Sequence, residues 1–187
     1  MREDLWNEDD LAQVLNNDGV VVMPTDTIYG IVGRAFSSKV IDRIYKLRKR
    51  TLEKPCIILI GDIKELKKFG IELSPKQEII VNEYWPGPVS IVIDCPSDDL
   101  FQLHRGTKTL AFRMPSPEGL RNLLNKTGPI IAPSANLEGR FPSRSIEDAY
   151  KYFGKNVDKY VDGGTIHNNP SLILRLFNDD TTTIIRS

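Results

Sequence analysis

The stretch that most constrains the fold is Val20 to Gly30, in which four consecutive apolar residues run into Pro24 and then into the polar Thr25-Asp26-Thr27. The apolar residues do not alternate with polar ones, which indicates a strand buried on both faces. Proline has no N–H group for a strand ladder, so we expect the strand to end at Pro24. The polar residues then follow a buried strand, where open α/β sheets bind ligands. An ordinary Asx or Ser/Thr turn is the alternative, and the role of Asp26 is left open.

The composition is that of an ordinary soluble domain, with 187 residues of which 40% are apolar and 27% are charged. The formal net charge is zero, so attraction to nucleic acid requires a local basic patch. Cys56 and Cys95 lie in apolar runs, which predicts buried thiols and no disulfide framework. No apolar run has the length of a membrane span, and the acidic start lacks a signal-peptide core. We therefore expect a cytoplasmic protein without a membrane partner.

The order of the elements predicts one α/β domain over residues 1–187, built on a mixed sheet with flanking helices. Capping residues and apolar spacing predict helices at 9–15, 38–47, 62–69, 75–84, 117–125 and 145–153. Apolar runs predict strands at 20–23, 56–60, 89–94, 109–114, 129–132, 157–161, 172–176 and 182–186. The polar stretch from Cys95 to Lys108 is expected to be a loop.

Positive charge is concentrated in the segment from Lys39 to Lys54, which holds seven basic residues and only two acidic ones. A charge run on a helix is usually a solvated face. The group Arg48-Lys49-Arg50 differs because it lies where the predicted helix ends and the next strand approaches. Like charges crowded at such a place repel one another, and a bound polyanion relieves that repulsion, for which arginine is well suited. The residues alone leave phosphate binding and a solvated face open.

Two further features are candidate ligand contacts. Arg113 lies within an apolar strand, where a charge is costly unless it is paired or faces a cleft. It either holds a carboxylate in an open cleft or lies on the exposed face of an alternating strand. The stretch Pro133-Ser134-Ala135-Asn136 follows a short buried strand and offers hydroxyl, amide and backbone N–H groups. An ordinary Ser/Asn turn is the alternative there.

Several chemistries have no support in the sequence. There is no Walker A loop and no Rossmann glycine motif after the first predicted strand. The two histidines, His104 and His167, do not have zinc-ligand spacing, and no nucleophile–histidine arrangement is visible. A bound nucleotide would therefore be held by a basic cleft and by loops at strand ends, with catalysis by positioning and charge stabilisation.

Several motifs in one order make the chain similar to the YrdC/TsaC family, over nearly its whole length. In chain order they are Pro24-Thr25-Asp26-Thr27-Ile28-Tyr29-Gly30, Arg48-Lys49-Arg50 with Lys54-Pro55, Trp85-Pro86-Gly87-Pro88, Arg113-Met114-Pro115, Ala132-Pro133-Ser134-Ala135-Asn136, and Asp162-Gly163-Gly164 with Pro170-Ser171. The resemblance implies a twisted, open α/β sheet with a basic concave surface. It also implies a nucleotidyltransferase, L-threonylcarbamoyladenylate synthase, that makes threonylcarbamoyl-AMP and diphosphate from ATP, L-threonine and bicarbonate or CO2.

The same resemblance implies the partners. Other proteins would transfer the threonylcarbamoyl group to a tRNA adenosine beside the anticodon, and the basic cleft is a possible direct contact for tRNA. Mg²⁺ is the expected cofactor, and it would be held mostly by the ATP phosphates rather than by protein ligands.

Carried over to matching positions, the family's threonine contacts are Thr27, Arg113, Ser134 and Ser171. Arg113 would pair with the carboxylate of the substrate, which agrees with its reading from the residues alone.

The family's ATP contacts fall on Arg48, Arg50, Lys54, Asn136 and Arg186. Arg48 and Arg50 would also be catalytic, because they stabilise the negative charge that accumulates on the phosphates. Asn136 belongs with Ser134 to the family's Ser-x-Asn element.

Three positions depart from the family pattern. Arg48 stands in place of a lysine, and arginine is not equivalent to that compact point charge. Leu172 follows Ser171 where a threonine is usual, and Leu59 replaces a histidine found in some relatives. Two alternatives are open. The basic cluster Arg48–Arg50 fits a nonenzymatic module that binds double-stranded RNA or tRNA, and the departures at Arg48 and Leu172 fit a paralogue with the same fold but different carbamoyl-transfer chemistry. ATP consumption separates these alternatives from the synthase, because only the synthase requires both threonine and bicarbonate to consume ATP.

Overall fold

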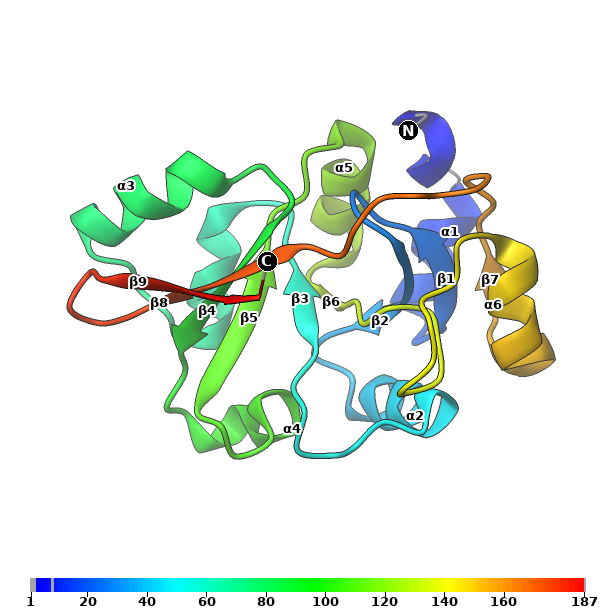
Figure 1. The fold of residues 1–187 in the computed structure, drawn as a ribbon, viewed down its shortest axis with the longest axis horizontal. Helices are drawn as coiled ribbons and strands as arrows, with labels where there is room; N and C mark the ends of the chain where they lie inside the picture. Colours follow the sequence, from blue (N-terminus) through cyan, green and yellow to red (C-terminus); the bar gives the residue numbers. More distant parts are fainter. Residues whose placement is uncertain (1–2, 8, 187) are drawn as a thin grey trace.

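The fold is a mixed sheet with helices on both faces, seen in a computed structural model that describes residues 3–7 and 9–186 (Figure 1). The predicted domain boundaries at residues 1 and 187 lie outside the described residues. Within the described part the sheet has nine strands in the order β7-β1-β2-β6-β3-β5-β4-β8-β9. The strands are β1 Val21–Pro24, β2 Tyr29–Arg34, β3 Ile57–Leu59, β4 Val89–Asp94, β5 Thr109–Arg113, β6 Ile130–Ile131, β7 Lys159–Tyr160, β8 Leu172–Leu176 and β9 Thr182–Arg186.

Parallel and antiparallel pairs alternate irregularly in this sheet, as predicted for a mixed α/β fold. β1 with β7, β3 with β5, and β4 with β8 are parallel, and the other pairs are antiparallel. The ends of the order, β7 and β9, do not pair with each other, so the sheet is open. In Figure 1 the connection from β7 to β8 crosses in front of the sheet, and β9 brings the C-terminus to the centre of the view.

The helical elements follow the predicted capping residues closely. They are η1 Glu3–Trp6, α1 Asp9–Asn16, α2 Ser38–Arg48, η2 Ile63–Phe69, α3 Pro75–Tyr84, η3 Asp98–Leu100, α4 Phe101–His104, α5 Glu118–Thr127, α6 Ile146–Phe153 and η4 Gly154–Asn156. Ser37, Asp62, Ser74 and Ser145 each accept a hydrogen bond at the start of a helix, from α2, η2, α3 and α6 respectively. None of the helices in the described part of the chain has the length and apolar character of a membrane span.

The run that begins at Val20 is buried on both faces, as its lack of alternation predicted. Val20 and Val22 belong to a large apolar cluster that includes side chains of α2 and α6. Val21 and Met23 point the other way, into a second cluster with side chains of η1, α1 and α5. A strand with apolar neighbours on both sides needs no polar face, which is why four apolar residues follow one another.

The second strand in chain order, β2, was not predicted. Its sequence contains Gly30 and Gly33, and glycine disfavours strands. Both glycines allow close packing: a Cβ on Gly33 would lie 2.2 Å from a Val40 methyl group of α2. β1 and β2 form an antiparallel hairpin, and the polar residues after Pro24 are its turn, closed by a hydrogen bond from the Thr25 N–H to the Ile28 carbonyl (3.0 Å).

The predicted loop between Cys95 and Lys108 is wrong, since it contains η3 and the single turn of α4. Leu103 and His104 are buried there. The imidazole of His104 contacts the Ser97 carbonyl (3.1 Å) and accepts from the Gly106 N–H (3.1 Å), so its polar atoms are satisfied inside the fold. Cys56 and Cys95 are buried and form no disulfide, as predicted, and the Cys95 thiol donates to the Phe69 carbonyl at 3.7 Å.

Candidate functional site

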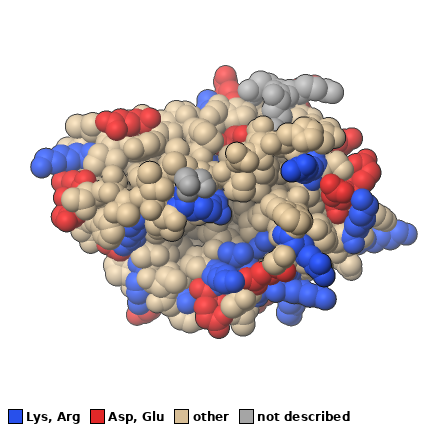
Figure 2. All heavy atoms as spheres, in the orientation of Figure 1, with Lys and Arg blue, Asp and Glu red and all other residues tan. Residues whose placement is uncertain are grey.

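A cavity of about 250 Å³ opens where the β1–β2 turn, β3, the end of β5, the loop after β6 and the start of β8 converge. Six of the residues predicted to bind substrate lie in its wall: Thr27, Arg50, Arg113, Ser134, Ser171 and Arg186. These residues are scattered over the chain, and the sheet order brings them together. Figure 2 shows a hollow near the centre of this face with Lys and Arg side chains beside it.

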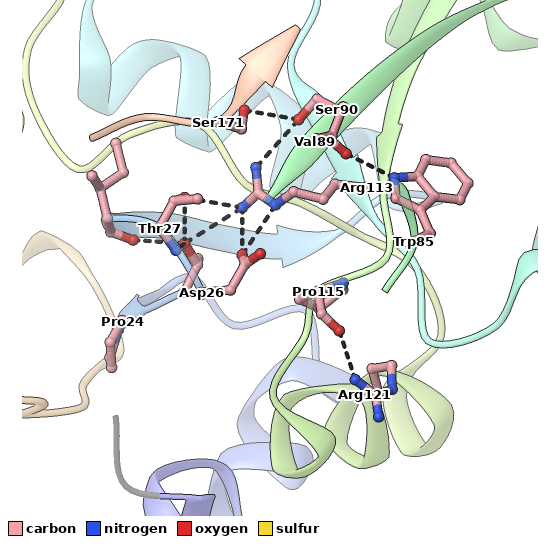
Figure 3. A network of polar contacts seen from close by, with 12 residues as sticks. Pro24, Asp26, Thr27, Trp85, Val89, Ser90, Arg113, Pro115, Arg121 and Ser171 are labelled. Carbon is pink, nitrogen blue, oxygen red and sulfur yellow. Dashed lines mark hydrogen bonds and ion pairs between the residues drawn. The ribbon is translucent and has the colours of Figure 1, made fainter. Parts of the chain in front are cut away.

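Arg113 is the buried cation of the site, and Asp26 is its partner. Both side chains are only 3% exposed. The Arg113 Nε donates to Asp26 Oδ1 at 3.0 Å, and Nη2 lies 3.0 Å from the same oxygen (Figure 3). The reading of Arg113 as part of an exposed strand face is therefore wrong. Asp26, whose role the sequence left open, pairs with Arg113 from the hairpin turn.

The remaining contacts of Arg113 are long. Nη1 donates to Ser90 Oγ at 3.3 Å, and Nη2 donates to Thr25 Oγ1 at 3.5 Å and to Thr27 Oγ1 at 3.3 Å (Figure 3). Hydrogen bonds at the upper end of the distance range are weak. Thr25, Thr27 and Arg113 all line the cavity. The guanidinium is thus fixed on one side by a carboxylate, while its contacts with hydroxyl groups can be exchanged for those of a ligand.

Burial sets the electrostatics of this pair. It raises the pKa of the Asp26 carboxyl above its ordinary value, and the charge of Arg113 opposes that rise. Burial likewise lowers the pKa of Arg113, and Asp26 opposes that change. Asp26 Oδ2 is buried and has no hydrogen-bond partner among the described residues. The pair depends on its mutual contact, because both side chains are almost completely buried.

Ser90 connects Arg113 to the other end of the sheet. Its hydroxyl lies 2.9 Å from the hydroxyl of Ser171, and Arg186 Nη2 donates to the Ser171 carbonyl at 2.8 Å. Burial lowers the pKa of Arg186. Ser90 was missed at the sequence level, although a hydroxyl within the apolar strand β4 is a signal for a buried polar contact. Two arginines from different strands are thereby joined through two serines.

Ser134 is held against the hairpin by the backbone on both sides of it. The Ile31 N–H donates to the Pro133 carbonyl (3.0 Å), and the Ala135 N–H donates to the Tyr29 carbonyl (2.9 Å). Gly30 relieves crowding within the hairpin itself, because a Cβ there would lie 3.2 Å from the methyl groups of Thr25 and Val32. Ser134 and Thr27 therefore lie in the same cavity wall.

Arg48 and Asn136 lie behind Ser134, outside the residues that line the cavity. Arg48 is buried, and its Nη2 donates to Ser134 Oγ (3.2 Å) and to Asn136 Oδ1 (3.1 Å). Burial and the nearby charge of Arg50 lower the pKa of Arg48 to about 10. In this arrangement Arg48 supports the loop that carries Ser134. The predicted roles of Arg48 and Asn136 in nucleotide binding stay predictions.

Arg50 reaches the cavity, whereas Lys54 does not line it. Arg50 donates from Nε to the Lys54 carbonyl (3.0 Å) and from Nη2 to the Pro55 carbonyl (2.8 Å). Lys54 is 58% exposed and forms an ion pair with Glu138. The predicted contact of Lys54 with ATP stays a prediction.

Leu59 and Leu172, two departures from the family pattern, are packed as apolar residues. Leu59 is buried in the cluster formed with α1 and α5. Leu172 is half-buried and packs against the larger cluster at the start of β8. Neither lines the cavity, whose wall at these strands is formed instead by Ile57 and Ile173.

A second cavity of about 620 Å³ adjoins the first and shares Ile28, Pro142 and Pro170 with it. Phe141, Tyr152 and Ile166 contribute apolar or aromatic surface, and Arg144, Asp148 and Lys151 contribute charge. The two cavities thus lie side by side, the first lined by more basic side chains and the second by more aromatic ones.

A comparison with family models identifies one match, the Sua5/YciO/YrdC model, described as telomere recombination, over residues 13–187. Among curated proteins, the chain is 32% identical to threonylcarbamoyl-AMP synthase of Bacillus subtilis over 82% of this chain and 45% of that protein. It is 29% identical to that of Buchnera aphidicola, over 88% of this chain and 96% of that protein. The chain spans about half the length of the first relatives it matches.

The similar solved structures include Sua5 and YciO. Sua5 of Pyrococcus abyssi, complexed with L-threonine, has a TM-score of 0.87 and 26% identity, over 100% of this chain and 55% of that one. YciO of Escherichia coli has a TM-score of 0.83 and 22% identity, over 100% of this chain and 90% of that one, and shows the fold alone. The open mixed α/β sheet predicted from the sequence is the fold of these proteins.

Proposed function

Because this chain belongs to the Sua5/YciO/YrdC family, we propose that it is a threonylcarbamoyl-AMP synthase, which forms threonylcarbamoyl-AMP and diphosphate from L-threonine, bicarbonate or CO2, and ATP. One observation carries the proposal. The buried Arg113 shares a cavity wall with the hydroxyl groups of Thr27, Ser134 and Ser171 and with Arg50. That set suits a small amino acid next to a phosphate chain.

The amino acid occupies the Arg113 end of the cavity. Its carboxylate replaces the long contacts of the guanidinium with Thr25 and Thr27, since charge-assisted pairs are stronger than bonds to neutral hydroxyl groups. Ser171 and Ser134 offer hydroxyl groups to the amine and the hydroxyl of threonine. Asp26 keeps Arg113 in place from behind and does not line the cavity.

The phosphates of ATP lie toward Arg50 and Arg186, and the nucleoside extends into the second cavity. The first cavity alone, at about 250 Å³, is small for both substrates, whereas the adjoining space of about 620 Å³ shares its wall. The aromatic and apolar side chains there suit a base, and Arg144 and Lys151 lie beside it.

The reaction requires positioning rather than a covalent protein intermediate. The threonine nitrogen attacks the carbon of CO2 and releases a proton to form the carbamate. A carbamate oxygen then attacks the α-phosphorus of ATP, and the bond to the β-phosphate oxygen breaks so that diphosphate leaves. Arg50 and Arg186 stabilise the charge that accumulates on the phosphates. The cavity must exclude water, because a carbamate and an acyl-adenylate both hydrolyse readily.

Mg²⁺ would enter with the nucleotide, held mostly by its phosphates rather than by protein ligands, and would neutralise part of their charge. Among the described residues, no group of three or more His, Cys, Asp or Glu side chains lies together.

The product would be consumed by proteins that transfer the threonylcarbamoyl group to a tRNA adenosine. Direct tRNA contact through the basic face is part of the proposal, and a nonenzymatic RNA-binding module is the competing function. The buried position of Arg48 favours the enzyme, because one of the three clustered charges faces the interior rather than an external phosphate backbone.

The assay is ATP consumption with threonine and bicarbonate omitted in turn. The proposal requires dependence on both, whereas RNA binding without turnover would contradict it.

Arg50→Ala is expected to lower the rate of diphosphate release by at least about a hundredfold, because it removes a charge next to the reacting phosphates. The fold should be unaffected, since the Arg50 side chain hydrogen-bonds carbonyl groups of its own turn and otherwise lies 5.9 Å from the centre of the Tyr45 ring. Diphosphate release and thermal unfolding are measured on the same preparation. Turnover like that of the unmodified protein would contradict the assignment of Arg50.

A further inference from the structure

Glu138 lies over the end of α2, opposite the turn that carries Arg50. Its backbone N–H donates to the Arg48 carbonyl at 2.8 Å. The side chain is 23% exposed, so it is partly covered by the segment beneath it. Glu138 is two residues after Asn136 of the Ser134–Asn136 loop, and it therefore joins two parts of the candidate site that are far apart in sequence.

The carboxylate of Glu138 bonds three groups of that segment. Oε2 accepts from the Thr51 N–H at 2.5 Å and from Thr51 Oγ1 at 2.9 Å, and Oε1 accepts from Lys54 Nζ. A single exposed ion pair contributes little to stability, but a carboxylate that also holds a backbone N–H restrains the chain itself. We call the segment from Lys49 to Pro55 the basic turn.

The position of the basic turn determines where Arg50 points. The guanidinium of Arg50 bonds the carbonyl groups of Lys54 and Pro55, so it moves with the turn. The Tyr45 hydroxyl donates to the same Lys54 carbonyl at 2.7 Å, from α2. Glu138 thus restrains the basic turn from the side of the Ser134 loop, and Tyr45 restrains it from the side of the helix.

The charges of this contact are complementary. The bonds from Lys54 and Thr51 lower the pKa of Glu138 to about 2, so the carboxylate is ionised at neutral pH. The ammonium of Lys54 is engaged with this carboxylate and does not line the cavity. The described arrangement therefore gives Lys54 a counter-ion outside the cavity, while Arg50 faces the cavity.

We propose that Glu138 is a positioning residue for nucleotide binding: it fastens the basic turn to the Ser134 loop and so directs Arg50 into the cavity, with Lys54 acting through this contact. The proposal deepens the proposed function and rests on it, because the ligand of Arg50 is taken to be the phosphate chain of ATP. It assigns Glu138 no contact with substrate.

The first test measures the contact itself. Hydrogen exchange of the amides from Thr51 to Lys54 is followed without substrate in the unmodified protein, in Glu138→Ala and in Glu138→Gln. Glu53→Ala is the matched control, because Glu53 is an exposed acidic residue of the same turn. Exchange should rise at least about tenfold in Glu138→Ala and less in Glu138→Gln, which keeps an oxygen for the Thr51 N–H. Unchanged exchange in Glu138→Ala would overturn the proposal.

The second test measures what the contact does for the nucleotide. Glu138→Ala should weaken ATP binding, measured calorimetrically, by about tenfold, while the KM for threonine stays unchanged, since the Glu138 side chain bonds Thr51 and Lys54 and not Arg113. A variant that loses the contact but binds ATP like Glu53→Ala would overturn the proposal. So would an equal loss of affinity for both substrates, which indicates a general structural defect. If the unmodified protein binds ATP but forms no diphosphate with threonine, the proposed function is contradicted. The role of Glu138 is then still decided by how tightly the variants bind ATP.

A double-mutant cycle tests the role of Lys54. If Lys54 acts through Glu138, then Glu138→Ala and Lys54→Met weaken ATP binding to similar degrees, and the double variant is no weaker than either. Effects that multiply in the double variant would instead show that Lys54 binds the phosphates independently, which overturns that part of the proposal.

Discussion

Replacement of Arg113 by lysine should raise the KM for threonine by about a hundredfold or more, with ATP binding little changed. Lysine keeps a positive charge opposite Asp26, but it cannot reproduce the planar set of donors that contacts Asp26, Ser90 and Thr27 together. Loss of a buried charged hydrogen-bond partner costs about 2–5 kcal/mol, which corresponds to a loss of affinity between about thirtyfold and about four-thousandfold, and a hundredfold lies within this range. The measurement is diphosphate release as a function of threonine concentration.

Loss of threonine recognition must be told apart from loss of folding. Arg113→Met leaves Asp26 buried without its counter-charge and is expected to be unstable, so kinetics are measured on Arg113→Lys, which keeps the positive charge. Ser116→Ala serves as the control, because Ser116 is exposed and lies outside the cavity. A KM for threonine in Arg113→Lys equal to that of the control would exclude Arg113 as the carboxylate contact.

Asp26→Ala should lower the free energy of unfolding by about 3–5 kcal/mol, because it leaves the guanidinium of Arg113 buried and unpaired. Asp26→Asn should cost less, since the amide oxygen can still accept from Arg113 Nε. Urea denaturation gives the values. Removal of both charges in Asp26→Ala/Arg113→Met should recover part of the loss, because no buried charge remains without a partner. An Asp26→Ala variant within about 0.5 kcal/mol of the unmodified protein would show that the pair is not a buried unit.

The elements that the sequence predicts well are those with a strong local signal. The run from Val20 to Met23 lacks alternation and is buried on both faces, and the residues that cap α3 and α6 mark where these helices begin. β2 was missed because its two glycines weaken the strand pattern, although tertiary packing against α2 requires Gly33. α4 was missed because a single turn is too short for a periodic pattern.

In the candidate site, too, some residues could be predicted from the sequence and others could not. The order of the motifs predicted which residues meet, and six of them line one cavity. The partner of Arg113 was not predictable, because Asp26 is 87 residues away and only the sheet brings the two together. The inward position of Arg48 did leave a signal: it follows Ile41, Ile44 and Tyr45 at the spacing of the buried face of α2, so the basic cluster is split between interior and cavity.

The most direct test of the account is a crystal structure of this chain with L-threonine and a non-hydrolysable ATP analogue. The account predicts the threonine carboxylate on Arg113, with Asp26 still bonded behind it, and the phosphates of the analogue between Arg50 and Arg186. A threonine carboxylate bound elsewhere, with the guanidinium of Arg113 still contacting only Asp26 and the hydroxyl groups of Ser90, Thr25 and Thr27, would contradict it.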